Sequence, residues 1–117
     1  EHSHSQLIAL PIIPKRPLEL FSGAKTYFSY KDRCPFCDII RQELNDKVRL
    51  IEETKHFVSI TPFASRSPFE VSIFPKKHSA HFEFEEVEIL YDFTYILQNT
   101  LKRLKIALDN LRITLFY

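Results

Sequence analysis

A long apolar stripe near the end of the sequence restricts the architectures open to it. Between Phe84 and Asn110, leucine and phenylalanine side chains recur every three or four residues. That interval matches one face of an α-helix, so the pattern predicts a long amphipathic helix. Such a helix must bury its apolar face against another layer of structure. The stripe consists of Leu90, Phe93, Leu97, Leu101, Leu104 and Leu108.

Three strand patterns precede this helix and can provide the layer that it needs. Residues 48–53 and 56–61 carry β-branched and aromatic side chains, and residues 69–74 alternate apolar with polar side chains before Pro75. Between the second and third of these patterns, residues 62–68 hold two prolines and three small residues, which are typical of a turn. We therefore expect an α+β fold in which the long helix covers an antiparallel sheet.

The other segments give weaker patterns. Residues 7–14 predict a buried strand bounded by Pro11 and Pro14. Residues 18–30 predict one or two helical turns followed by a connector, and residues 38–44 predict a short helix that starts at Cys37. Residues 76–81 predict a polar connector.

Composition narrows the class of protein. The 117 residues are 44% hydrophobic, which suffices for one modest core, and the net charge of +1 gives no electrostatic case for binding nucleic acid or an anionic membrane. No run approaches the roughly 18 apolar residues of a membrane span, and no cationic and apolar leader precedes a cleavage site, so we expect a cytoplasmic protein. The single glycine and the absence of methionine suggest part of a longer chain.

Two histidines and a glutamine occupy every second position near the start of the sequence, at His2, His4 and Gln6. If extended backbone begins at His2, its period of two places these three side chains on one face. A neutral imidazole can attack phosphorus, and a neighbouring amide can donate a hydrogen bond to a phosphoryl oxygen. The same spacing also suits metal ligation. A solvated tail or the remnant of an expression tag is the alternative without a function.

Cys34 and Cys37 have the spacing of one half of a tetrahedral zinc site. A redox dithiol is disfavoured, because such a pair usually follows a strand and opens the long helix of a βαβ unit. Two buried cysteines without a ligand are a further alternative. His78 or His81 could supply more zinc ligands, His81 less readily because its spacing from His78 is shorter than usual. The alternative for these histidines is a solvated basic loop.

Two motifs resemble the galactose-1-phosphate uridylyltransferase family. The segment from His2 to Pro11, HSHSQLIALP, resembles the active-site segment of that family, whose core pattern is H-x-H-x-Q. The segment from Pro62 to His78 resembles the family's second-half signature, P-[FY]-x-x-x-x-P-F-E-x-x-I-x-P-K-x-H. With serine in both intervening positions, the HSHSQ motif resembles that of the family branch that includes ADP-glucose phosphorylase.

The resemblance implies a fold of two histidine-triad-like halves, each an antiparallel sheet with a long helix. Residues 1–33 would hold the end of the first half, with the active-site strand and a connector, and residues 34–117 an incomplete second half. It also implies that His4 attacks the α-phosphorus of a nucleotide sugar to form a nucleotidyl-histidine, and that Gln6 binds the transferred phosphoryl group.

The resemblance further implies two zinc sites. His2 corresponds to a ligand of the first zinc, whose other ligands would lie upstream. Cys34, Cys37 and His78 correspond to ligands of a second, structural zinc, whose fourth ligand in the family is a histidine beyond the long helix. After Asn110 the sequence departs from the family pattern, so the position of that fourth ligand is not given by the resemblance.

We therefore expect a nucleotidyltransferase that moves a uridylyl group between hexose 1-phosphates. Its partners would be a nucleotide sugar, a sugar 1-phosphate and, as the family suggests, a second copy of itself; neither nucleic acid nor a membrane is expected. Adenylyl transfer to phosphate is the alternative that the two serines favour. A third interpretation is a non-catalytic binding module, stabilised by zinc at Cys34, Cys37, His78 and His81.

Overall fold

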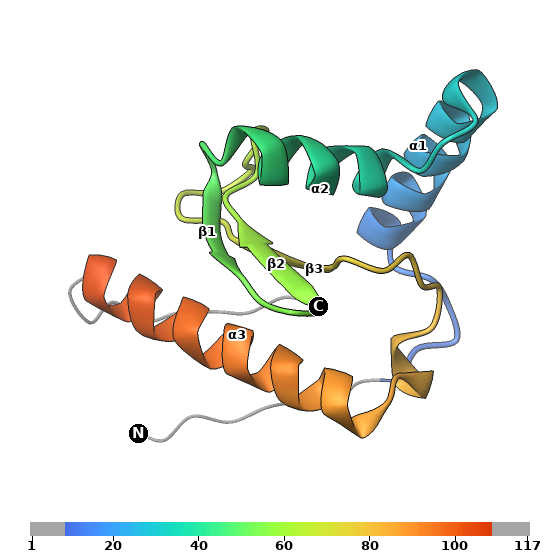
Figure 1. Ribbon diagram of the computed structural model, residues 1–117. Helices are drawn as coiled ribbons and strands as arrows, with labels where there is room; N and C mark the ends of the chain where they lie inside the picture. The colour runs from blue at the N-terminus through green and yellow to red at the C-terminus, as the bar shows by residue number, and fades with distance from the viewer. Residues whose placement is uncertain (1–8, 109–117) are drawn as a thin grey trace. The chain divides into compact units, whose positions relative to one another are not determined.

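The computed structural model describes residues 9–108, and of Glu83 the backbone only. Three α-helices, a short 3-10 helix (Phe82–Phe84) and three strands occur in this part of the chain (Figure 1). The chain divides into two compact units, Glu1–Phe36 and Cys37–Tyr117. Each unit is described by itself.

The first unit contains the helix α1 (Lys15–Lys31). Pro14 precedes its first residue, and the N–H of Leu18 donates to the Pro14 carbonyl at 3.2 Å. The helix ends at Asp32, which adopts a left-handed conformation with φ of 52° and donates its N–H to the Phe28 carbonyl. The helix is therefore longer than the one or two turns that the sequence predicts. Its length is not visible in the sequence because no residue of α1 is buried and no apolar stripe runs along it.

The strand predicted for residues 7–14 is wrong where the structure describes it. Residues 9–14 form no strand, and Leu10, Ile12 and Ile13 are each more than half exposed. Pro11 and Pro14 explain the absence of pairing, since a proline has no N–H to donate to a neighbouring strand. Residues 7 and 8 lie outside the described part of the chain.

The second unit is built on an antiparallel sheet, as predicted. The strands β1 (Leu50–Glu53), β2 (Phe57–Ile60) and β3 (Ser72–Pro75) lie in the order β1-β2-β3. Val58 pairs with Glu53 on one side and with Phe74 on the other. β3 starts later than predicted, because Phe69 has a φ of 60° and interrupts the extended backbone.

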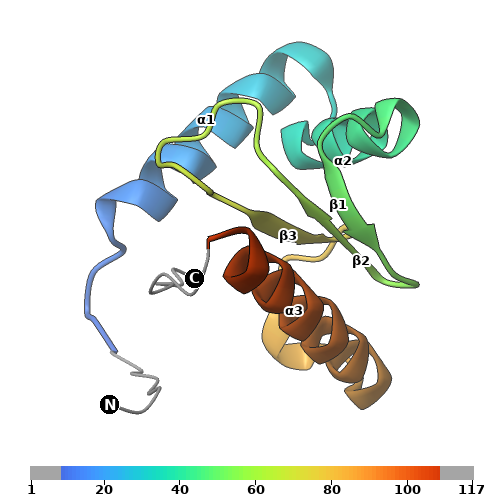
Figure 2. The same ribbon diagram turned by 90° about the vertical axis from the view of Figure 1, so that its left-hand side faces the viewer.

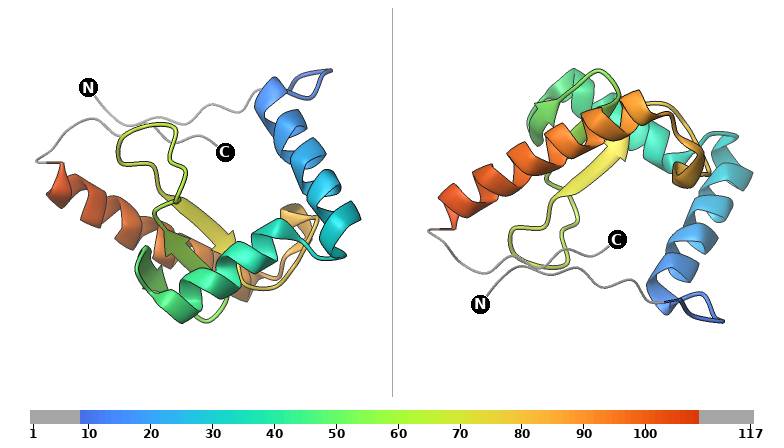
Figure 3. Two further views of the ribbon diagram at one scale, coloured as in Figure 1. Left: turned by 90° about the horizontal axis from the view of Figure 1, so that it is seen from above. Right: turned by 90° about the horizontal axis from the view of Figure 1, so that it is seen from below.

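One helix lies on each face of this sheet. The helix α2 (Pro35–Asp46) packs Ile40 and Leu44 against Val58 and Ile60, which point to one side of β2. The helix α3 (Val87–Ala107) lies on the opposite face, as Figures 2 and 3 show. All four residues of β2 are buried, since both faces of the strand are covered. The α+β class and the long helix are therefore confirmed.

The face that α3 buries is centred differently from the predicted stripe. Ile96 and Thr100 are its buried residues, whereas Leu90 is 37% exposed. Phe93 packs against Phe57 of β2 with ring centroids 5.4 Å apart, and Thr100 donates a hydrogen bond to Ser59 at 3.0 Å. The face of α3 that contacts the sheet therefore includes the polar pair of Thr100 and Ser59 and does not consist of leucines alone. None of the helices in residues 9–108 is long and apolar enough to cross a membrane.

Candidate metal centre

The two cysteines lie at the beginning of α2. Pro35 is the first residue of this helix, a position where its missing N–H costs nothing, so Cys34 immediately precedes the helix and Cys37 lies in its first turn. Both side chains are partly buried, and neither forms a disulfide.

His78 reaches the cysteines from the segment that follows β3. Its Nδ1 atom lies 3.3 Å from Sγ of Cys37. The ligand atoms of Cys34, Cys37 and His78 all lie within 4.8 Å of one another. This Cys-Cys-His group could hold a metal ion, and its soft sulfur and imidazole donors favour a transition metal over magnesium or calcium.

His81 takes no part in this group. Its side chain is exposed, and its ring lies against Phe84 with centroids 5.5 Å apart. Within residues 9–108, no fourth cysteine, histidine or carboxylate joins the three ligand atoms. The four-ligand arrangement that includes His81 is therefore not the one formed here.

The predicted active-site residues His2, His4 and Gln6 lie outside the described residues. Their roles as metal ligand, nucleophile and phosphoryl-binding group stay predictions from the sequence. Residues 109–117, which follow α3, also lie outside the described part of the chain.

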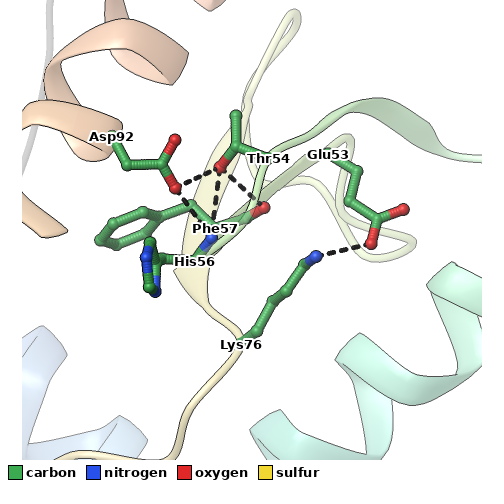
Figure 4. Close-up of polar contacts among 6 residues, drawn as sticks. All are labelled: Glu53, Thr54, His56, Phe57, Lys76 and Asp92. Carbon is green, nitrogen blue, oxygen red and sulfur yellow. Dashed lines mark hydrogen bonds and ion pairs between the residues drawn. The ribbon is translucent and has the colours of Figure 1, made fainter.

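A polar network around Asp92 joins α3 to the turn between β1 and β2 (Figure 4). Asp92 Oδ2 accepts hydrogen bonds from the hydroxyl of Thr54 and from the backbone N–H of His56, each at 2.8 Å. The N–H of Phe57 in turn donates to the Thr54 hydroxyl at 3.1 Å. The motifs in the sequence did not indicate this network. The recurrence of Asp92, Ile96 and Thr100 at every fourth residue was the available signal.

Lys76 connects the same turn to the His78 segment. Its backbone N–H donates to the His56 carbonyl at 2.8 Å, and its Nζ lies 2.6 Å from Oε1 of Glu53 (Figure 4). The His56 side chain is not part of this connection, because its Nε2 atom is buried without a hydrogen-bond partner. It lines a small pocket of about 60 Å³ with Phe57 and other side chains.

An exposed ion pair lies next to the Asp92 network in the sequence and differs from it in being open to solvent. Lys55 Nζ lies 2.8 Å from Glu88 Oε1, and both side chains are about 70% exposed. Their hydrogen bond and mutual attraction raise the pKa of Lys55 and lower the pKa of Glu88. Solvent screens such a pair, so its contribution to stability is small.

Comparisons with known proteins connect this geometry to a family. No family model matches the sequence. The chain is 44% identical over 81 residues to ADP-glucose phosphorylase of Arabidopsis thaliana, a match that covers 69% of this chain and 22% of that protein. It is 39% identical over 89 residues to galactose-1-phosphate uridylyltransferase of Thermotoga maritima, which covers 74% of this chain and 27% of that protein.

The fold gives the same result. A solved structure of a GalT-like protein from Arabidopsis thaliana matches with a TM-score of 0.76 and 34% identity, covering 86% of this chain and 32% of that one. The chain thus spans between about a fifth and a third of the length of these proteins. Over that span, sequence and fold agree, and the chain is a homologue of the galactose-1-phosphate uridylyltransferase family.

Proposed function

We propose that this chain forms part of a nucleotidyltransferase that moves a uridylyl group between hexose 1-phosphates. The observation that supports this most directly is the 39% identity to a galactose-1-phosphate uridylyltransferase over 89 residues. In the same proposal, the partners are a nucleotide sugar, a sugar 1-phosphate and a second copy of the protein, and its place is the cytoplasm. Residues 1–33 belong to the end of one half-domain and residues 34–117 to a second.

His4 is the proposed nucleophile. Its imidazole nitrogen attacks the α-phosphorus of the nucleotide sugar; a P–N bond forms and the P–O bond to the departing sugar 1-phosphate breaks. An oxygen of the acceptor phosphate then attacks the same phosphorus and releases His4. Gln6 donates a hydrogen bond to the transferred phosphoryl group, and His2 is a ligand of a first zinc.

Zinc is the metal that we propose for Cys34, Cys37 and His78. A tetrahedral zinc with ordinary bond lengths separates a sulfur ligand from a nitrogen ligand by about 3.6 Å. The 3.3 Å between Cys37 Sγ and His78 Nδ1 agrees with that separation. Two thiolates and a neutral imidazole also balance the charge of Zn²⁺. A zinc ion held by these three residues would have a structural role, because it would join the start of α2 to the segment after β3.

Adenylyl transfer to phosphate is the second candidate function. It is supported by the 44% identity to ADP-glucose phosphorylase over 81 residues and by Ser3 and Ser5 in the proposed active-site segment. In this reaction the same attack by His4 forms an adenylyl-histidine, and inorganic phosphate is the acceptor. The two functions differ in the nucleotide and not in the covalent step.

Mass spectrometry of the intact protein tests the nucleophile and separates the two functions. Incubation with UDP-glucose or ADP-glucose in the absence of acceptor should add the mass of one nucleotidyl group, and only the preferred donor should do so efficiently. His4→Ala should abolish the added mass, whereas His81→Ala, which removes an exposed histidine outside the metal group, should retain it. Unchanged labelling of His4→Ala would falsify the assignment of His4.

A further inference from the structure

The Asp92 carboxylate is the anchor of a chain of hydrogen bonds that runs from α3 into the β1–β2 turn. Both of its bonds, to the Thr54 hydroxyl and the His56 N–H, are made by one oxygen at 2.8 Å. Hydrogen bonds to an ionised carboxylate are about twice as strong as neutral ones. Asp92 is partly buried, so water competes less for this oxygen than at an exposed site.

The next link in this series of hydrogen bonds runs through the backbone of one residue, His56. His56 uses its N–H toward Asp92, and its carbonyl accepts from the N–H of Lys76 at 2.8 Å. Lys76 is held a second time through its side chain, which pairs with Glu53 at 2.6 Å. Lys76 is therefore held through its backbone by His56 in the turn and through its ammonium group by Glu53 at the end of β1; Figure 4 shows the second of these contacts.

His78 lies two residues beyond Lys76. The side chains of residues 77–80 are all exposed, so packing does little to place them. Within residues 9–108, the N–H of Lys76 is the last backbone donor to the sheet before His78. The direction in which the chain leaves Lys76 therefore decides where His78 lies relative to Cys37.

We propose that Asp92 is a positioning residue for the metal centre, acting through the backbone of His56 and through Lys76 to hold His78 against Cys37. The functional meaning of this inference rests on the proposed metal site. The placement of His78 beside Cys37, however, is present in the structure without a metal. The hydrogen bonds of Asp92 within residues 9–108 go to Thr54 and His56 and not to Cys34, Cys37 or His78. Its effect passes through the β1–β2 turn and the end of β3.

Metal affinity is the first readout. Zinc binding to the 117-residue chain is measured by competition with a chelator, at a temperature where every variant is folded by circular dichroism. Asp92→Ala should lower zinc affinity by up to roughly 10-fold, the lower end of the effect of losing a group that is hydrogen-bonded directly to a metal ligand. Asp92→Asn should recover most of it, because an amide oxygen can still accept both hydrogen bonds.

Three matched controls separate positioning from loss of stability. Thr100→Ala removes another hydrogen bond between α3 and the sheet, and Glu88→Gln removes a neighbouring carboxylate of α3; both should keep the affinity of the unaltered chain. His56→Ala should keep it as well, since the proposed connection uses only the His56 backbone. Equal losses in Asp92→Ala and Thr100→Ala would show that affinity follows stability, and the proposal would be wrong.

A cross-link provides a readout without metal. In a Cys34→Ser, His78→Cys parent, the disulfide between Cys37 and the new cysteine is titrated against a glutathione redox buffer. Adding Asp92→Ala should lower the effective concentration of the two thiols at least several-fold, and adding Glu88→Gln should not. An unchanged value, or no cross-link in the parent, would overturn the proposal. If the unaltered chain binds no zinc but the cross-link weakens with Asp92→Ala, the metal centre falls and the positioning role stands.

Discussion

At the scale of single residues, the candidate metal centre brings together side chains that come from two separate parts of the sequence. Cys37 and His78 are 41 residues apart in the chain, and their ligand atoms lie 3.3 Å apart in the structure. A metal held between them would couple the start of α2 to the end of β3. Binding free energy at such a site adds to folding free energy, because the unfolded chain does not hold the ligands together.

The first prediction concerns the metal ligands. Cys34→Ser should lower the zinc content of the purified chain from near one ion to near none and should lower its melting temperature, because a hydroxyl is a poor ligand for zinc. Elemental analysis and thermal unfolding measure the two effects. Ser79→Ala, close to His78 in the sequence, is the control and should change neither. Full zinc retention in Cys34→Ser would contradict the ligand assignment.

A second prediction concerns a buried carboxylate. Nε and Nη2 of Arg49 lie 2.8 and 2.7 Å from one oxygen of Glu43, whose side chain is only 5% exposed. Arg49→Met should therefore destabilise the fold by about 3 kcal/mol, since it leaves a buried charge without its partner. Arg103→Met, whose side chain is 61% exposed beside Glu52, should cost about 0.5 kcal/mol or less. Urea unfolding at neutral pH measures both, and equal costs would contradict this account.

The predictability of individual residues follows from how local their contacts are. The spacing of Cys34 and Cys37 is a property of the sequence itself, so these candidates were identified without a structure. The partner of Asp92 is a turn more than thirty residues earlier in the chain, and Glu43 pairs with Arg49 across the end of a helix. Such pairings depend on tertiary packing, and no spacing in the sequence encodes them.

At the scale of elements, α3 covers one face of the sheet in the second unit and buries Ile96 and Thr100. Ile96 is completely buried against the sheet, whereas Ile106 on the same helix is 81% exposed. Ile96→Ala should lower the free energy of unfolding by roughly 2–5 kcal/mol through lost burial and the cavity left behind. Ile106→Ala is the matched control and should change it by less than about 0.5 kcal/mol. Chemical denaturation measures both; similar costs would mean that α3 does not pack by this face.

The elements were predicted to the extent that their periodicity reflects burial. The sheet and α3 have one face or both faces covered, and their patterns predicted their existence and order. α1 has no buried residue, so its sequence lacks the stripe that would have shown its full length. The strand predicted for residues 7–14 is absent from the described residues 9–14, because apolar side chains alone do not ensure burial and Pro11 and Pro14 cannot donate to a sheet.

At the scale of the whole molecule, the chain corresponds to between 22% and 32% of the length of the proteins that it resembles. The match to the solved GalT-like structure covers 86% of this chain with a TM-score of 0.76, so the similarity extends over most of the chain. Catalysis by His4 and its dependence on His2 and Gln6 are therefore proposals about the protein's activity, supported by similarity and by the motif.

Isotope exchange is the most direct test of the proposed covalent mechanism. The protein is incubated with UDP-glucose and radiolabelled glucose 1-phosphate, with no galactose 1-phosphate present. A uridylyl-histidine at His4 predicts that label enters UDP-glucose, because the first half-reaction runs in both directions, and that His4→Ala abolishes the exchange. ADP-glucose in place of UDP-glucose reveals the adenylyl alternative by the same readout. Net transfer to an acceptor without any exchange of either nucleotide sugar would contradict the mechanism.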